Sequence, residues 1–165
     1  MLERDRTFHA HPMVFINEEE KFDIENASRR LMWHGMFLFL LGLITGFVEQ
    51  RFTNVRMGLA AHLEGVMNGT FLLALGAAWS AVSLRPAIKA TAYWTVLYGT
   101  YMNWVFTTLA AIFGTGALSP ITAPGRIAQP WQETLVMTGF KSVGVVIVIS
   151  TILILWGLRA KSSQA

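Results

Sequence analysis

The chain has 165 residues, of which 53% are hydrophobic and only 14% are charged. This composition is too apolar for an ordinary soluble domain and indicates a membrane protein. The net charge of +3 comes from basic residues that form no long cluster, so it indicates membrane orientation rather than nucleic-acid binding. Cysteine is absent, which excludes disulfides, thiolate nucleophiles and thiolate metal sites.

Residues 1–30 form a polar extension that contains the acidic run "NEEEKFDIEN". It has no apolar core followed by a small-residue cleavage site, so we expect no signal peptide. The remaining chain is interpreted as one domain over residues 31–158, followed by a short tail at 159–165. We find no internal repeat.

Four segments are long and apolar enough to cross a membrane, which takes ~20 mostly apolar residues. They are residues 31–49, 57–82, 88–114 and 134–158. Polar links, "RFTNVR" and "SLRPA", separate the first three segments. Residues 115–133 hold three prolines and cannot form a continuous helix, so this longest loop is a candidate lid. The sequence therefore predicts an all-α membrane protein, a bundle of four transmembrane helices.

The basic residues predict how this bundle is oriented. With four spans, both termini lie on the same side of the membrane. Nine lysines and arginines fall on that side and three fall on the other. Because cytoplasmic segments carry the excess of lysine and arginine, both termini are expected in the cytoplasm.

Several polar residues lie inside the predicted spans, and their depth suggests pairs. Glu64 in the second span and Lys141 in the fourth both lie ~10 Å from the external face, and Asn68 and Asn103 both lie ~16 Å from it. An ionisable group in the hydrocarbon costs ~2.5–3.5 kcal/mol and usually pairs. We therefore predict an ion pair between Glu64 and Lys141, with the two asparagines at a shared level.

His62 has two interpretations: a hydrogen-bond donor between helices, or an axial ligand of haem iron. It points about 120° away from Asn68, so its helix can serve the protomer interior and a subunit interface. His34 lies ~20 Å away along the bundle, which is too far for both histidines to bind one haem. A haem on His62 would keep its opposite axial position open, which favours chemistry on a ligand over electron transfer.

Other residues near these levels stay ambiguous. Tyr98 and Tyr101 flank Asn103 and either pack in the core or line an aromatic pocket with phenol donors. Gly65 and Gly69 permit close approach of another helix or of a flat cofactor. Periodicity alone does not choose between these possibilities.

Three stretches carry a family resemblance: "RMGLAAHLEGVMNGTFLLALG" (56–76), "WHGMFLFLLGLITG" (33–46) and "YGTYMNW" (98–104). Together they resemble the small membrane mutases that convert hydroxylaminobenzene to 2-aminophenol. They are similar, more distantly, to styrene oxide isomerase, whose second helix has a histidine followed six residues later by an Asn-Gly pair. Here that motif is His62 with Asn68-Gly69. The resemblance covers roughly residues 31–158 and leaves the acidic extension outside.

The resemblance implies a homotrimer in the bacterial inner membrane, with haem b near the protomer contacts. It implies that His62 is the axial ligand, with Gly65 and Gly69 beside the cofactor, and that ferric iron acts as a Lewis acid on the substrate oxygen. Asn68 and Asn103 would then orient a small aromatic substrate. Tyr98 and Tyr101 are candidate hydrogen-bond donors to the substrate. Glu64 and Lys141 would hold the neighbouring site residues in place without contacting the substrate.

The match departs from the isomerase at two positions. Its substrate-orienting tyrosine falls at about Thr107 here, and its aspartate falls near Tyr98 or Gly99. This departure favours the mutase branch, which rearranges an arylhydroxylamine to an ortho-aminophenol. The alternatives are an epoxide-to-aldehyde isomerase, a haem-binding electron-transfer or sensing subunit, and a haem-free structural or transport subunit that uses Glu64 and Lys141.

Overall fold

The computed structural model describes residues 18–118, 120–123, 125 and 128–159, and the side chains of this part from residue 25 onward. Four long helices make up most of it: α1 (Glu18–Val48), α2 (Val55–Ala78), α3 (Pro86–Phe113) and α4 (Pro130–Gly157). Two 3-10 turns, η1 (Glu49–Arg51) and η2 (Trp79–Ala81), end the first two helices. The described residues contain no strand, which confirms the predicted all-α class.

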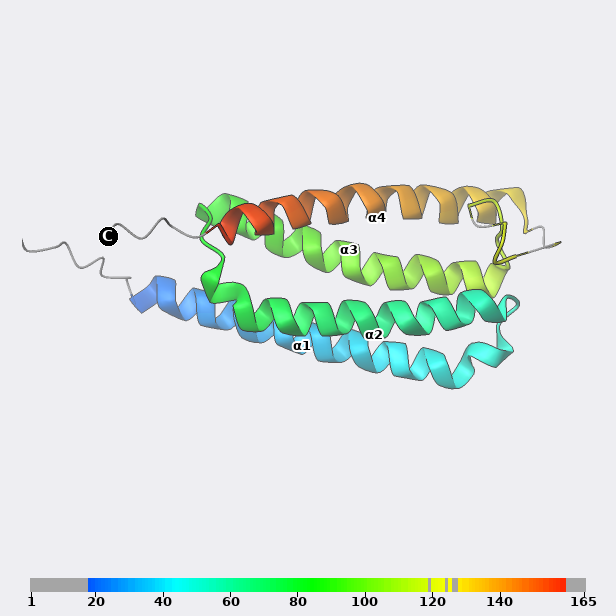
Figure 1. The fold of residues 1–165 in the computed structure, drawn as a ribbon, viewed down its shortest axis with the longest axis horizontal. Helices are drawn as coiled ribbons and strands as arrows, with labels where there is room; N and C mark the ends of the chain where they lie inside the picture. Colours follow the sequence, from blue (N-terminus) through cyan, green and yellow to red (C-terminus); the bar gives the residue numbers. More distant parts are fainter. Residues whose placement is uncertain (1–17, 119, 124, 126–127, 160–165) are drawn as a thin grey trace, which may run out of the picture.

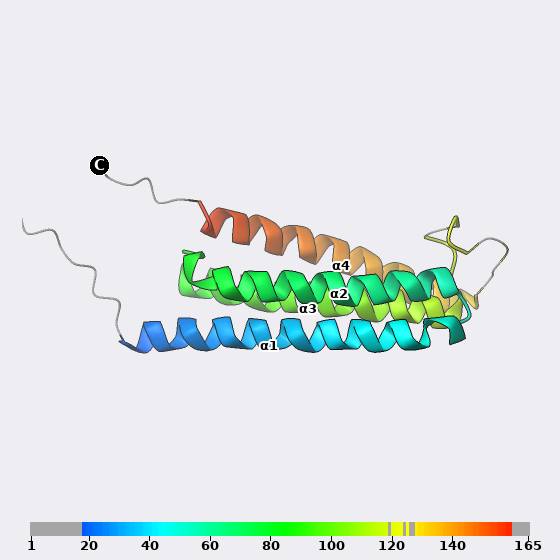
Figure 2. The same ribbon diagram turned by 60° about the horizontal axis from the view of Figure 1, so that its bottom comes forward.

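Each helix packs against the next one in the chain (Figure 1). Figure 2 shows α1 and α4 on opposite sides of the layer formed by α2 and α3. The start of α1 and the end of α4 lie at the same end of the bundle (Figure 1). Four helices that run up and down in turn bring the chain back to the end of the bundle where it started (Figure 1). The terminal residues 1–17 and 160–165 lie outside the described residues.

Local signals set the helix ends. The side chain of Asn54 caps α2 by accepting a hydrogen bond from the backbone N–H of Met57 at 3.2 Å. Proline occupies the first position of α3 and of α4, where its missing N–H is not needed. Gly114 ends α3 in the left-handed conformation at φ 72°, which glycine adopts without strain.

The predicted boundary at residue 30 is not a break in the structure, because α1 begins at Glu18 and runs through it. Glycine and proline are absent from residues 18–34, and acidic residues in a first turn favour the helix dipole. Ser28 donates a hydrogen bond to the carbonyl oxygen of Gly76 in α2. The end of the expected extension is therefore already part of the bundle.

Three helical segments are long and apolar enough to cross a membrane: Glu25–Arg51, α3 and α4. The shorter α2 is not among them, and it carries His62, Glu64 and Asn68. Large apolar side chains lie on the outside of the bundle; Phe47 is 89% exposed. Such surfaces mark contact with lipid or with other proteins, so the chain has the features of a membrane protein.

Hydrogen bonds fasten the loop between α3 and α4 to the bundle. Asn54, which is 2% exposed, donates its backbone N–H to the carbonyl oxygen of Ala111 and its side-chain amide to the carbonyl oxygen of Thr122. The carboxylate of Glu133 accepts the backbone N–H groups of Gly116 and Ala117 at 2.9 and 3.1 Å. The expected lid is thus tied to the starts of α2 and α4.

Candidate functional site

His62 faces α1 across the α1–α2 contact. Its Nδ1 lies 2.8 Å from the carbonyl oxygen of Gly42. Because a carbonyl oxygen only accepts, Nδ1 carries a proton, and in the neutral ring this tautomer leaves the lone pair on Nε2. Among the described residues Nε2 has no hydrogen-bond partner, and it is not enclosed by protein. A neutral histidine held in this way is the form that binds a metal.

Two glycines of α1 let α2 approach closely: Gly46 makes room for the His62 ring, and Gly42 makes room for the α2 backbone. A Cβ on Gly46 would lie 2.7 Å from His62 Nδ1, and a Cβ on Gly42 would lie 2.6 Å from the backbone nitrogen of Val66. Both distances are too short for a real Cβ. Sequence reasoning did not single out these glycines, although their spacing of four residues places them on one face of α1.

Gly65 and Gly69, which we expected beside a cofactor, pack against the backbone of α1. A Cβ on Gly69 would lie 2.5 Å from the backbone nitrogen of Phe39, and one on Gly65 would collide with Gly42 Cα. These two glycines therefore bring α1 and α2 together. Contact of these two glycines with a cofactor stays a prediction, and the space that a Cβ would take on either of them is filled by the α1 backbone.

A polar cluster joins α2 to α3 on another face of α2. Glu64 Oε2 accepts hydrogen bonds from Asn68 Nδ2 at 3.0 Å and from Asn103 Nδ2 at 2.5 Å. All three side chains are half-buried. Asn68 and Glu64 are four residues apart on one face of α2, and Asn103 reaches them from α3. We call these three residues the carboxylate–amide cluster.

The predicted ion pair between Glu64 and Lys141 is wrong within one chain. Lys141 is exposed on α4, and α4 packs along α3 rather than α2. No ion pair of Glu64 occurs in the part of the chain that the structure describes, and one oxygen of its carboxylate is already bound by two amides. Equal depth places two residues at one level but does not place them on facing sides of the bundle.

The two tyrosines hold other contacts. The Tyr101 hydroxyl lies 3.0 Å from His34 Nδ1 and 3.3 Å from the His34 carbonyl oxygen, so it links α3 to α1. The Tyr98 hydroxyl lies 3.0 Å from Ser142 Oγ on α4. The structure thus brings neither hydroxyl to the carboxylate–amide cluster.

A further carboxylate, Glu49, was missed by sequence reasoning. Its Oε2 is buried without a hydrogen-bond partner. Glu49 lies three residues after Gly46, and its backbone oxygen would meet a Cβ on Gly58 at 3.1 Å. Its backbone therefore lies against Gly58, one turn of α2 before His62. Its position at the end of an apolar run resembled an ordinary helix end, so no signal in the sequence set it apart.

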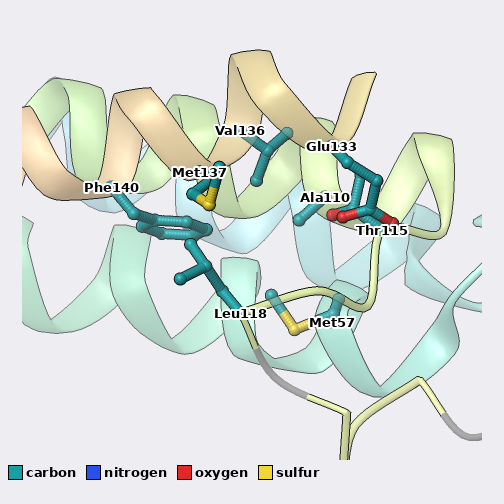
Figure 3. Close-up of a pocket in the computed structure, with 8 residues that line it drawn as sticks. All are labelled: Met57, Ala110, Thr115, Leu118, Glu133, Val136, Met137 and Phe140. Atoms are coloured by element: carbon teal, nitrogen blue, oxygen red, sulfur yellow. The ribbon is translucent and has the colours of Figure 1, made fainter. Parts of the chain in front are cut away.

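A small cavity lies under the α3–α4 loop (Figure 3). Its volume is about 20 Å³, and Glu133 lies at one side with Met57 and Phe140 among the apolar lining residues. This volume holds one water molecule but no aromatic ring. The loop therefore does not cover a preformed substrate pocket at this point.

The described residues contain no group of three or more histidine, cysteine, aspartate or glutamate side chains that could hold a metal ion. A metal at His62 would thus need most of its ligands from a cofactor. A single histidine with an open Nε2 would be able to hold a haem, whose porphyrin would supply most of the other iron ligands.

Comparisons with known proteins place these features in a family. The model of the styrene oxide isomerase family matches residues 27–159. Hydroxylaminobenzene mutase HabB of Ectopseudomonas oleovorans is 44% identical over 138 residues, covering 83% of this chain and 84% of the relative. Hydroxylaminobenzene mutase HabA of the same organism is 43% identical over 103 residues, covering 62% and 76%. No solved structure matches. The chain therefore belongs to the styrene oxide isomerase family and is an enzyme of the isomerase or mutase type.

Proposed function

We propose that this enzyme is a membrane-bound, haem b-dependent mutase that rearranges an arylhydroxylamine to an ortho-aminophenol. The names of the two relatives support the substrate class. The observation that carries the cofactor is the His62 ring, fixed through Nδ1 to Gly42 and open at Nε2. In the reaction the N–O bond breaks, a C–O bond forms at the ortho carbon and the ring proton is transferred to nitrogen, so no external oxidant is needed.

The residues of the chain divide into two roles. His62 would hold the haem, and the backbone of α1 behind it would keep Nε2 as the ligating atom. When bound, ferric haem supplies a Lewis acid for a substrate oxygen. Asn68 of α2 and Asn103 of α3 would orient the substrate by hydrogen bonds from the α2–α3 contact.

The separation of these two roles supports an oligomer. His62 and Asn68 are six residues apart and so differ in direction by about 120° around α2. A substrate that meets both the cofactor and the amides is therefore more easily held between two copies of the chain than within one. We propose the homotrimer expected from the resemblance, with α2 as a fourth membrane span shielded by its neighbours.

The same proposal covers location. The protein would be a multi-pass protein of the bacterial inner membrane, with both termini in the cytoplasm. The three apolar helical segments and the shared end of α1 and α4 support it (Figure 1).

The cofactor is tested by absorption spectra of the detergent-purified protein, oxidised and then reduced with dithionite. We expect a Soret band that His62→Ala removes together with turnover. Asn68→Ala is expected to keep the band and to lose about a hundredfold or more in turnover, as for loss of one positioned hydrogen-bonding group. A fully active His62→Ala protein would end the haem proposal.

The substrate is tested by product analysis with N-phenylhydroxylamine and with styrene oxide. We expect 2-aminophenol from the first. Because the family model is that of styrene oxide isomerase, phenylacetaldehyde from the second substrate alone would favour the epoxide alternative. A haem that is reduced and reoxidised while neither substrate reacts would favour an electron-transfer or sensing subunit.

A further inference from the structure

In the carboxylate–amide cluster, the hydrogen bonds fix which atom of each amide faces Glu64. Both amide groups direct their Nδ2 donors at the same atom, Glu64 Oε2. An oxygen that receives two N–H groups is an acceptor whether or not the other carboxyl oxygen carries a proton. Each amide is planar, so an Nδ2 turned toward Glu64 leaves Oδ1 turned away from it.

The two amide oxygens are open to a ligand. In the described part of the chain, neither Asn68 Oδ1 nor Asn103 Oδ1 has a hydrogen-bond partner, and neither is enclosed by protein. In an apolar membrane interior an acceptor without a donor is costly. The cluster therefore presents two hydrogen-bond acceptors, Asn68 Oδ1 and Asn103 Oδ1, to whatever binds beside it, and each Nδ2 has one N–H group committed to Glu64.

We infer that Glu64 is a positioning and specificity-determining residue: it locks Asn68 and Asn103 as acceptors, so that the site prefers ligands that carry N–H or O–H groups. This inference rests on the proposed function for the identity of the substrate. An arylhydroxylamine has one N–H and one O–H donor, whereas an aryl epoxide has none. A site built to pair a donor rejects the analogue that lacks it, because its acceptors are then left unpaired.

Glu64 acts through its acceptor oxygen rather than through its charge. In Glu64→Gln the amide oxygen of the new side chain can take the position of Oε2 and still receive both asparagine donors. In Glu64→Leu no acceptor remains, so the two asparagine amides are free to rotate and offer N–H groups. The two variants thus separate loss of charge from loss of orientation.

The probes are phenol and anisole, which share one ring and one oxygen and differ in the O–H group. Their affinities for the purified full-length protein are measured from the ligand-dependent rise in melting temperature, which needs no turnover. We expect phenol to bind the wild type and Glu64→Gln at least about tenfold more tightly than anisole. In Glu64→Leu the ratio should fall to about one to three, as the amides rotate.

Three outcomes would overturn the inference. The wild type could bind phenol and anisole with equal affinity, Glu64→Gln could lose the preference for phenol as fully as Glu64→Leu, or Glu64→Leu could keep the wild-type preference. If Glu64→Leu does not fold, Asn103→Leu replaces it, since this change removes one of the two acceptors and should also lower the ratio. Turnover of N-phenylhydroxylamine by the wild type is measured separately. A donor preference without turnover keeps the inference and rejects the proposed function, while turnover without a donor preference does the reverse.

Discussion

The two contacts that α2 makes are built from opposite chemistry. Toward α1, glycines let the two backbones approach closely, and the His62 ring lies against Gly46 and the Gly42 carbonyl oxygen. Toward α3, the contact includes a carboxylate and two amides joined by hydrogen bonds. The first contact gives its polar residue a fixed tautomer through a backbone carbonyl, and the second gives its amides a fixed orientation through a side chain.

This difference explains why the two contacts should respond differently to mutation. Close backbone packing has no room to adjust, so an added methyl group must move a whole helix. A side-chain network can lose one member and keep the helices in place, because the remaining groups can rotate or bind water. We therefore expect changes at the α1–α2 contact to act on folding and haem binding, and changes at the α2–α3 contact to act on ligand recognition.

The largest effect is expected from Gly65→Ala. The added Cβ would collide with Gly42 Cα, and such overpacking costs typically 1–3 kcal/mol or more. We expect a melting temperature several degrees lower in detergent, followed by circular dichroism. Gly144→Ala is the matched control, since a Cβ at this α4 position meets no atom within 4 Å. Equal melting temperatures for the two variants would contradict the close packing of α1 on α2.

A change at Gly46 tests the His62 side of the comparison. In Gly46→Ala the new Cβ would lie 2.7 Å from His62 Nδ1 and would push the ring away from the Gly42 carbonyl. Loss of a hydrogen bond that orients a metal-binding histidine typically lowers affinity 10–100-fold. We expect haem affinity to fall by that factor in a titration of the apoprotein, while the helical content stays unchanged. Unchanged haem affinity would show that the Nδ1 bond does not support the ligand.

Charge exchange tests whether Glu64 and Lys141 act independently. Because the structure separates them, Glu64→Lys combined with Lys141→Glu should lose the sum of the two single effects, to within about 0.5 kcal/mol in the free energy of unfolding. The measurement is a double-mutant cycle in detergent. Restored stability in the double variant would mean that the pair forms between copies of the chain.

The smallest effects are expected at the tyrosines. Tyr101→Phe removes the hydroxyl that links α3 to His34 of α1 and should cost about 1 kcal/mol of stability. Tyr98→Phe removes a contact to Ser142 from a side chain that is 42% exposed and should cost less. Both variants should keep turnover of N-phenylhydroxylamine within about twofold of wild type, since neither hydroxyl reaches the amides. A tenfold or greater loss of turnover in either variant would indicate that the hydroxyl of that tyrosine takes part in catalysis.

The sequence by itself determined the helical class, the approximate ends of the helices and the family. Runs of apolar residues separated by polar or proline-rich links are local signals, and the His62 to Asn68 motif lies within one helix. The polarity of the acidic start of α1 predicts a separate extension. The helix continues through it, since no residue between 18 and 34 interrupts helical geometry.

Only the tertiary structure decided which polar residues meet. Depth along a span follows from counting residues, but the direction in which a side chain points relative to other helices depends on how the helices are arranged around the bundle axis. In that arrangement Glu64 accepts hydrogen bonds from Asn68 and Asn103 and does not contact Lys141. The backbone of α1 fills the space beside Gly65 and Gly69. It also places a backbone carbonyl behind His62, which no pattern of side chains encodes, because a carbonyl oxygen belongs to every residue alike.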